Sequence, residues 1–263
     1  MSEAASASLS SSASSDEERS KAFVAALTTR PGLAALAVNA FLSTNRPTLS
    51  MLYSSARSSD ELRAGLDERS QSKSSDGLKG LELVATLFGF VHNARVQAYT
   101  ASAYASALLL LVDNGFYELK YVGDIDKDRH GGPLFQGQEF SRLVRAATNQ
   151  LRHGHGWRGE PQHSMAKQNI ATLRAIGIED VVSNSVPMLV LNVIRGDSYF
   201  EFEKSLGEAL LCIILGKSNA EIYAENGGKS PIMRELELSA LAEETRGLRE
   251  VLGFSTRAPA SPQ

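Results

Sequence analysis

The feature that most constrains the fold is a long stretch that begins at Leu78. It runs about 35 residues without proline before the pair Asn114-Gly115, which favours a helix end, and Asp76 is placed to cap its start. Alanine and serine dominate its middle and permit close approach of other helices. Apolar residues recur along it with the 3.6-residue period of one helix face: Leu81, Val84, Leu87, Phe88, Val91, Tyr104, Leu108 and Leu111. The stretch therefore predicts the central core helix of a bundle.

Shorter helices are predicted on both sides of this stretch. Before it, residues 17–45 predict two helices broken at Pro31-Gly32, Pro47 starts a third, and Asp60 caps a fourth that ends near Arg69. After it, a further set of helices is expected over 138–153, over 169–176 with Gly177 as its end, from the Ser198/Glu201 capping box onward, and from Pro231 to about residue 252. The apolar run Met188–Ile194 permits a strand.

These patterns predict an all-α fold of the helical-bundle type, with extra N- and C-terminal helices. The polar segment Ser70–Gly77 separates two expected parts, an N-terminal helical segment over 17–70 and the bundle domain over 76–253. Residues 1–16, rich in serine and alanine, and residues 254–263 are expected to be disordered tails.

Composition narrows the class of protein. Hydrophobic residues make up 43% and charged residues 22% of the chain, as in soluble globular proteins. A net charge of −3 argues against a dedicated binder of duplex nucleic acid but leaves room for a local basic site. The longest apolar region, 81–112, contains Glu82, His92 and Arg95, which argues against a membrane span.

The cellular compartment is predicted from two further features. No signal peptide is visible, and the only cysteine, Cys212, lies in an apolar run where we expect it to be a buried small side chain. A single cysteine excludes an internal disulfide and fits a reducing compartment. We therefore expect a cytoplasmic protein that does not enter a membrane.

The polar residues best suited to chemistry gather between Arg145 and Arg158. This stretch holds three arginines, two histidines, an asparagine and the only tryptophan. At 100° per residue, one face of the predicted helix collects Arg145, Asn149, Arg152 and His153, and the opposite face is apolar. Two interpretations follow: a solvated face whose arginines suit the helix C-terminus, or a site where arginines bind phosphate and a histidine moves a proton.

Trp157 also has two interpretations, since its ring could stack on a base or pack on the core. The string Ala147-Thr-Asn149-Gln-Leu-Arg152-His153-Gly-His155-Gly-Trp157 resembles the terminal motif of HEPN-type proteins, and Gln168–Ile178 resembles the short helix that follows it in some members. The resemblance covers residues 137–178. It implies a helical bundle of the kind common in prokaryotic toxin and phage-defence systems, whose catalytic members are metal-independent endoribonucleases with a site shared across a homodimer.

The resemblance also implies roles for single residues. Arg145 and Arg152 would hold the scissile phosphate, His153 or His155 would act as general base or acid, and Asn149 would orient it. Trp157 and Arg158 would contact RNA. The alternative is a non-catalytic helical module that binds RNA, or a partner protein of a defence or toxin–antitoxin system, through the same face. Seven residues separate Arg145 from His153, more than catalytic members usually have, and this spacing favours the alternative.

Three other groups of residues were considered as sites. Asp124, Asp126 and Asp128 favour a solvated turn, with a bound divalent ion as the alternative, because the rest of the calcium-loop pattern is missing. His153, His155 and His163 match no standard zinc module. His92 is expected to be a core histidine, unless its helix packs on the 138–153 helix and brings His92 and Arg95 into the site. No metal and no cofactor is expected.

Overall fold

A computed structural model describes residues 30–73, 80–123, 131–157, 163–225 and 227–228 of the chain. Most of this part is helical, which confirms the predicted all-α class, and its only sheet is one short hairpin. None of its helices has an apolar stretch of the length needed to cross a membrane. The expected tails, the aspartate loop at 124–128 and the helix expected from Pro231 lie outside the described residues.

The chain divides into two compact units, Met1–Asn219 and Ala220–Gln263. The described part of the second unit belongs almost wholly to a short helix, α8 (Asn219–Glu225). Within the first unit, the helices before and after the expected linker at 70–77 pack against each other, so they belong to one unit. All that follows concerns this first unit.

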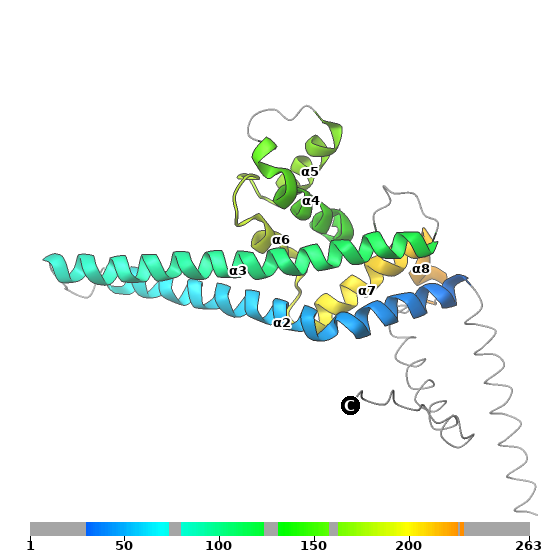
Figure 1. Cartoon of the computed structure of the whole chain (residues 1–263), viewed down its shortest axis with the longest axis horizontal. Helices are drawn as coiled ribbons and strands as arrows, with labels where there is room; N and C mark the ends of the chain where they lie inside the picture. Colours follow the sequence, from blue (N-terminus) through cyan, green and yellow to red (C-terminus); the bar gives the residue numbers. More distant parts are fainter. Residues whose placement is uncertain (1–29, 74–79, 124–130, 158–162, 226, 229–263) are drawn as a thin grey trace, which may run out of the picture. The chain divides into compact units, whose positions relative to one another are not determined.

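Two long helices, α2 (Arg30–Lys73) and α3 (Gly80–Gly123), form an antiparallel hairpin (Figure 1). They make the most extensive helix–helix contact of the unit. Apolar side chains of α2 are buried against apolar and small side chains of α3, among them Val38, Leu42, Leu49, Leu52, Ala101, Ala105, Leu108 and Val112. The prediction of several short helices between residues 30 and 73 is therefore wrong, because one continuous helix spans them.

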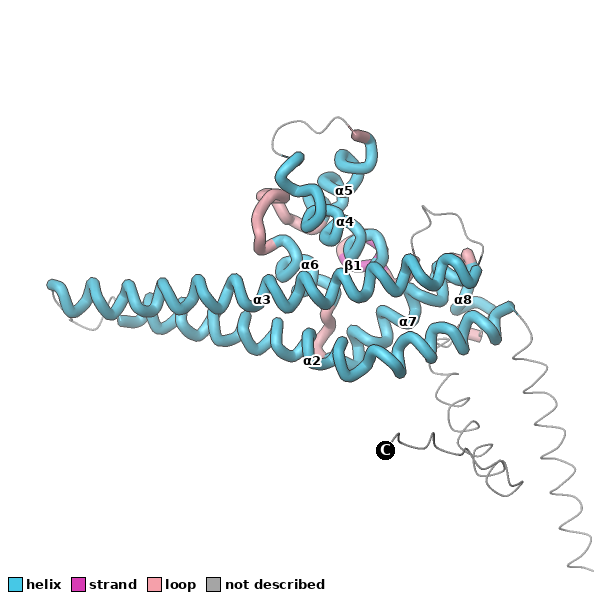
Figure 2. The backbone as a smooth tube through the Cα atoms, viewed as in Figure 1, coloured by secondary structure: helices cyan, strands magenta, loops and turns pink. Residues whose placement is uncertain are grey.

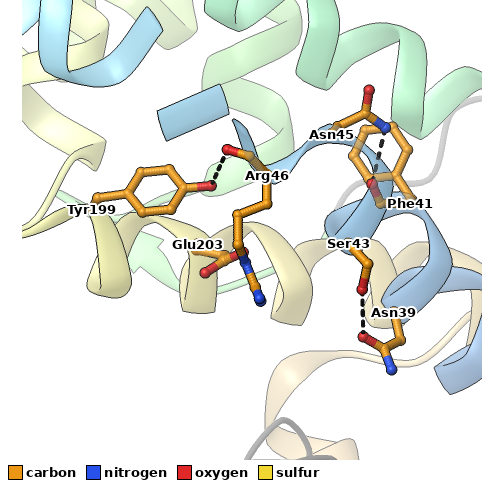
Figure 3. A network of polar contacts seen from close by, with 7 residues as sticks. All are labelled: Asn39, Phe41, Ser43, Asn45, Arg46, Tyr199 and Glu203. Carbon is orange, nitrogen blue, oxygen red and sulfur yellow. Dashed lines mark hydrogen bonds and ion pairs between the residues drawn. The ribbon is translucent and has the colours of Figure 1, made fainter. Parts of the chain in front are cut away.

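Helix α2 passes through Pro47 instead of starting there. Proline has no backbone N–H, so the carbonyl of Ser43, four residues earlier, loses its helical donor. Polar side chains line this turn of α2: Asn45 Nδ2 donates to the Phe41 carbonyl at 2.9 Å, and the Ser43 hydroxyl donates to Asn39 Oδ1 at 3.2 Å (Figure 3). The helix boundary expected at Pro47 is therefore absent, and α2 continues through it.

Helix α7 (Tyr199–Leu215) meets α2 at this same place (Figure 3). The Arg46 guanidinium pairs with the Glu203 carboxylate at 2.6 Å, and the Tyr199 hydroxyl makes a long 3.5 Å hydrogen bond to the Arg46 carbonyl. Burial, with the nearby Glu203 carboxylate, raises the pKa of Tyr199 to about 12. The hydroxyl therefore stays protonated at neutral pH and can donate to the carbonyl.

Helix α3 also continues where an end was predicted. It passes through Asn114-Gly115 to Gly123, and Gly115 lies directly against the ring of Phe41 on α2. A Cβ at this position would stand 2.6 Å from Phe41 Cε2, so any larger side chain would push the two helices or the ring apart. Gly115 permits close approach of α2, and the pair is not a helix end.

The remaining helices of the unit pack onto this hairpin. Their bounds are α4 (Phe140–His153), the 3₁₀ turn η1 (Gly154–Trp157), α5 (Ser164–Ala175) and α6 (Val186–Ile194). Helices α4 and α6 contact α3, α5 contacts α4, and α7 contacts both α2 and α3 (Figure 2). The prediction of a helix over 138–153 is confirmed, and α5 begins five residues earlier than expected.

Two predictions about α6 and α7 have opposite outcomes. The run Met188–Ile194, for which a strand was considered, belongs to a helix that carries Pro187 in its first turn, where proline favours a helix start. The Ser198 cap expected before α7 is confirmed, because the Glu201 N–H donates to Ser198 Oγ at 3.3 Å. The Glu201 carboxylate accepts at 2.7 Å from the N–H of Asp197, one residue before the N-cap, where the standard capping box uses the N–H of the N-cap residue itself.

A two-stranded hairpin, unpredicted from the sequence, leads into α4. Strands β1 (Leu134–Phe135) and β2 (Gln138–Glu139) pair antiparallel around Gln136-Gly137, whose φ values of 50° and 79° suit a two-residue hairpin turn. Gly132 precedes the hairpin with φ of 105°. A Cβ on Gly132 would lie 2.7 Å from the Ala209 Cβ of α7. This glycine is therefore required by both conformation and space.

We expect Gly132→Ala to lower the free energy of unfolding by about 2–4 kcal/mol, because strain at positive φ adds to overpacking against α7. Gly137→Ala is the matched control: its φ is also positive, but a Cβ there would meet nothing within 4 Å. That control should lose only about 1 kcal/mol. Chemical denaturation of both variants measures the difference, and equal losses would contradict the close packing of Gly132 on α7.

Candidate functional site

The candidate site lies on α4, which has the two faces that the sequence predicts. Its apolar side is buried and includes Phe140, Leu143, Val144 and Ala147. On the other side Arg145 and Asn149 are half-buried, and Arg152 and His153 are exposed. The helix ends at His153 as expected, but Gly154 keeps a right-handed conformation with φ of −58°, and the chain continues as η1.

The structure adds to this face an acidic residue from α3. The Asp113 side chain is only 8% exposed, and its Oδ2 accepts a hydrogen bond of 2.9 Å from Arg152 Nη1. The Nε of Arg145, two turns earlier on α4, lies 3.9 Å from Asp113 Oδ1. Two guanidinium groups thus share one carboxylate, which leaves the group of three with a net charge of +1.

This arrangement fixes the arginines without burying them. The side chains of Arg145 and Arg152 remain 23% and 42% exposed. A guanidinium carries five N–H donors in a planar fork, and the bond to Asp113 uses one of those of Arg152. A shared carboxylate holds both groups near each other and lowers the number of rotamers that an incoming anion would have to freeze.

Buried polar residues of α4 hold the helix in place from its other sides. The hydroxyl of Thr148, which is fully buried, donates to the Arg145 carbonyl at 3.1 Å. Gln150 is 5% exposed, and its Nε2 donates to the Ser183 carbonyl at 3.2 Å, which ties α4 to the segment before α6. The Thr148 bond lies within α4, so the direction of the polar face is set by the Gln150 bond together with the pairing of Arg152 and Asp113 of α3.

The histidines of the motif are placed differently from one another. His153 is exposed at the last residue of α4, directly after Arg152. His155 is in η1, but its side chain lies outside the described part, and so does all of Arg158. His163 is exposed just before α5. Within the described ranges, no group of three histidine, cysteine, aspartate or glutamate side chains is arranged to hold a metal ion.

Trp157 was expected to contact RNA, with packing on the core as its other interpretation. The structure places this side chain inside the unit, where it is only 6% exposed. A ring buried to this extent offers no free face on which a base could stack. Trp157 therefore belongs with the core residues and is removed from the RNA-facing set.

The residues of α3 that were considered as additions to the site lie elsewhere. His92 is exposed, so the prediction of a core histidine is wrong, and its ring stacks on Phe88 with 6.2 Å between centroids. His92 precedes Asp113 by 21 positions in the sequence, which is roughly 30 Å along a helix. Helix α3 does pack on α4, but it brings Asp113 to the site and leaves His92 and Arg95 far away.

Sequence reasoning missed Asp113, although one clue was present. It is the lone charged residue at the end of the apolar run Leu108–Val112, on a helix expected to lie at the centre of the bundle. A carboxylate in such a place requires a cationic partner. The two arginines of the neighbouring amphipathic helix could have been suggested as that partner.

A second polar cluster joins α2 to α6 and has the opposite charge balance. Arg63 donates to Asp60 at 2.9 Å and to Asp67 at 2.8 Å, and Asn192 of α6 donates to Asp60 at 3.4 Å. The hydrogen bond to Asp60 raises the pKa of Arg63. Two carboxylates and one guanidinium leave this cluster net negative, so it does not suit an anionic ligand.

Comparisons with protein-family profiles, with curated proteins and with solved structures find no match to this chain. The resemblance to HEPN-type proteins therefore rests on the residues of the motif alone. What the structure itself contributes is the local arrangement: an amphipathic α4, two arginines on one buried carboxylate, and an exposed histidine at the helix end.

We expect Asp113→Asn to lower the free energy of unfolding by about 1–3 kcal/mol, because the buried carboxylate loses its charge-assisted bond while Arg152 stays partly solvated. A double-mutant cycle with Arg152→Ala should give a coupling of about 1 kcal/mol. The exposed Arg57–Glu61 pair of α2 is the control, with an expected loss within about 0.5 kcal/mol for Glu61→Gln. Zero coupling between positions 113 and 152 would contradict the pairing.

Proposed function

We propose that the polar face of α4 binds the phosphate backbone of RNA. The observation that carries the proposal is the placement of the Arg145 and Arg152 guanidiniums beside the single carboxylate of Asp113, with the Arg152 side chain exposed. Arginine suits this role because its planar fork matches the oxygens of a phosphate group.

Three features favour single-stranded RNA as the ligand. The chain carries a net charge of −3, so the attraction is local to this face and unlike the broad basic surface of a duplex binder. Asn149, between the two arginines on the same face, has both donor and acceptor atoms that a ribose 2′-hydroxyl can use. The motif around Asn149 and His153 also resembles the HEPN type, which includes RNA-directed proteins of prokaryotic defence and toxin systems.

Metal-independent cleavage of the bound RNA is the second candidate function. Its specific support is the exposed His153 at the end of the arginine face. A neutral imidazole would take the proton of a 2′-hydroxyl while that oxygen attacks the adjacent phosphorus and the bond to the 5′-oxygen breaks. The leaving oxygen would take a proton from water, and the arginines would stabilise the developing negative charge. The products would be a 2′,3′-cyclic phosphate and a 5′-hydroxyl.

The binding proposal predicts that Arg145→Ala with Arg152→Ala weakens binding of labelled single-stranded RNA by at least about tenfold, or 1.4 kcal/mol. The dependence of log K on log salt should also become shallower by about 1.4, since two phosphate contacts are lost. Arg57→Ala with Arg69→Ala, on α2, removes the same charge and is the control. Equal losses in the two double variants would show that binding depends only on net charge and would contradict the proposal.

The cleavage candidate predicts that the purified chain cuts labelled RNA in the presence of EDTA, and that His153→Ala abolishes cutting while RNA binding stays within about twofold. His163→Ala, which removes another exposed histidine, should cut normally. Gel analysis of the products reports the cyclic phosphate. Intact RNA after incubation with folded wild-type protein would contradict cleavage. It would not bear on RNA binding, which the double arginine variant tests separately.

A further inference from the structure

The first half of α3 carries a large apolar surface on the side away from α2. The side chains that form it are exposed by 45–88%: Leu81, Val84, Phe88, Val91, Val96 and Tyr99. We call these six residues the α3 patch. The side that faces α2 is less exposed and includes Leu87, Phe90 and Ala94. The periodicity that predicted a core helix over 81–112 is thus correct as a helical pattern and wrong about burial in this half.

The size of the α3 patch is unusual for a surface without a partner. An aromatic residue carries about 150–250 Å² of contact area, so the exposed parts of Phe88 and Tyr99 alone come to roughly 200–300 Å². Four aliphatic side chains extend this surface along the helix. Exposed apolar patches above a few hundred Å² mark interaction sites. The spacing of Leu81, Val84, Phe88 and Val91, alternately three and four residues, is that of a helix that pairs with another helix.

We propose that the α3 patch pairs with the α3 patch of a second copy of this chain, with the two helices antiparallel. A twofold axis at the level of residue 90 brings exposed side chains level with one another along most of the patch. Leu81 then lies level with Tyr99 of the second copy, Val84 with its Val96, and Phe88 with its His92. This register is self-complementary, as a twofold interface requires, because the exposed residues lie at equal distances on either side of residue 90.

Charge and bulk both select the antiparallel orientation. In a parallel pair, the exposed Arg95 would lie against Arg95 of the second copy, whereas the antiparallel register separates them by ten residues, or about 15 Å. The half of α3 that carries most of its buried residues, where the other helices pack, begins at Ala101. In the antiparallel pair, the second half of α3 in one copy extends past Gly80, the first residue of α3 in the other copy. The helices that pack on the second half of each α3 therefore do not collide.

This interface is independent of the function proposed for α4. Tyr99 precedes Asp113 by 14 positions, which places the end of the α3 patch about 20 Å from the arginine site along the helix. Loss of pairing therefore need not remove RNA binding, and loss of RNA binding need not remove pairing. The two proposals can fail separately.

Sedimentation velocity of the full chain tests the pairing. The mass should rise toward twice that of one chain between about 1 and 100 µM, as expected for an interface near the lower end of the stable size range. Phe88→Glu should weaken association by at least about tenfold, since a charge would be buried at the contact. Phe200→Glu on α7 makes the same change at a phenylalanine exposed by 60%, compared with 71% for Phe88, and should associate normally.

Two results would overturn the proposal: a single-chain mass at the highest concentration, or undiminished association of Phe88→Glu. The first would mean that the patch takes another protein or another part of the same chain. Circular dichroism should show both variants to be folded, since each replaces an exposed side chain.

Disulfide trapping tests the orientation. Ala85→Cys and Arg95→Cys place thiols at equal distances from residue 90, and Cys212 is buried in the parent chain. Oxidation of a mixture of the two variants should give the mixed disulfide-linked dimer in preference to either self-linked dimer. Predominant self-linking of each variant would show parallel pairing and overturn the proposed arrangement.

Discussion

The buried seam between α2 and α3 positions the rest of the first unit. Each helix has 44 residues, and a helix in a folded protein gains most of its stability from packing its apolar face against other elements. Gly115 lets Phe41 approach across the seam, and α2 continues through Pro47. Helices α4 and α6 then pack on α3, and α7 packs on both helices of the hairpin. The direction of α4, and so of the arginine face, follows from this seam.

One carboxylate connects that scaffold to the candidate chemistry. Asp113 belongs to α3, whereas its partners Arg145 and Arg152 belong to α4. The packing of α4 on α3 therefore also positions the two guanidinium groups. An ion pair with one partly exposed partner adds modest stability. Its larger effect is to restrict the side-chain conformations of Arg145 and Arg152 before any ligand binds. This alignment is the basis of the proposed binding of an anion.

The sequence predicts local structure here more reliably than it predicts partners. Helix α4 and its two faces follow from the order of apolar and polar residues, and the Ser198 cap of α7 follows from the spacing of Ser198 and Glu201. Pro47 and Gly115 misled the prediction because their local preference for ending a helix is outweighed by contacts across the hairpin. Burial of Trp157, exposure of Phe88 and the role of Asp113 depend on which helices meet, and periodicity along one chain does not contain that information.

The central claim is that Arg145 and Arg152, aligned by Asp113, contact RNA phosphate. Side-chain ¹⁵N NMR of the arginines, recorded while a short single-stranded RNA is added, tests it most directly because it reports each guanidinium separately. We expect shifted and exchange-protected Nε signals for Arg145 and Arg152, with those of Arg57 and Arg69 unchanged. RNA binding that leaves the signals of Arg145 and Arg152 unchanged would contradict it.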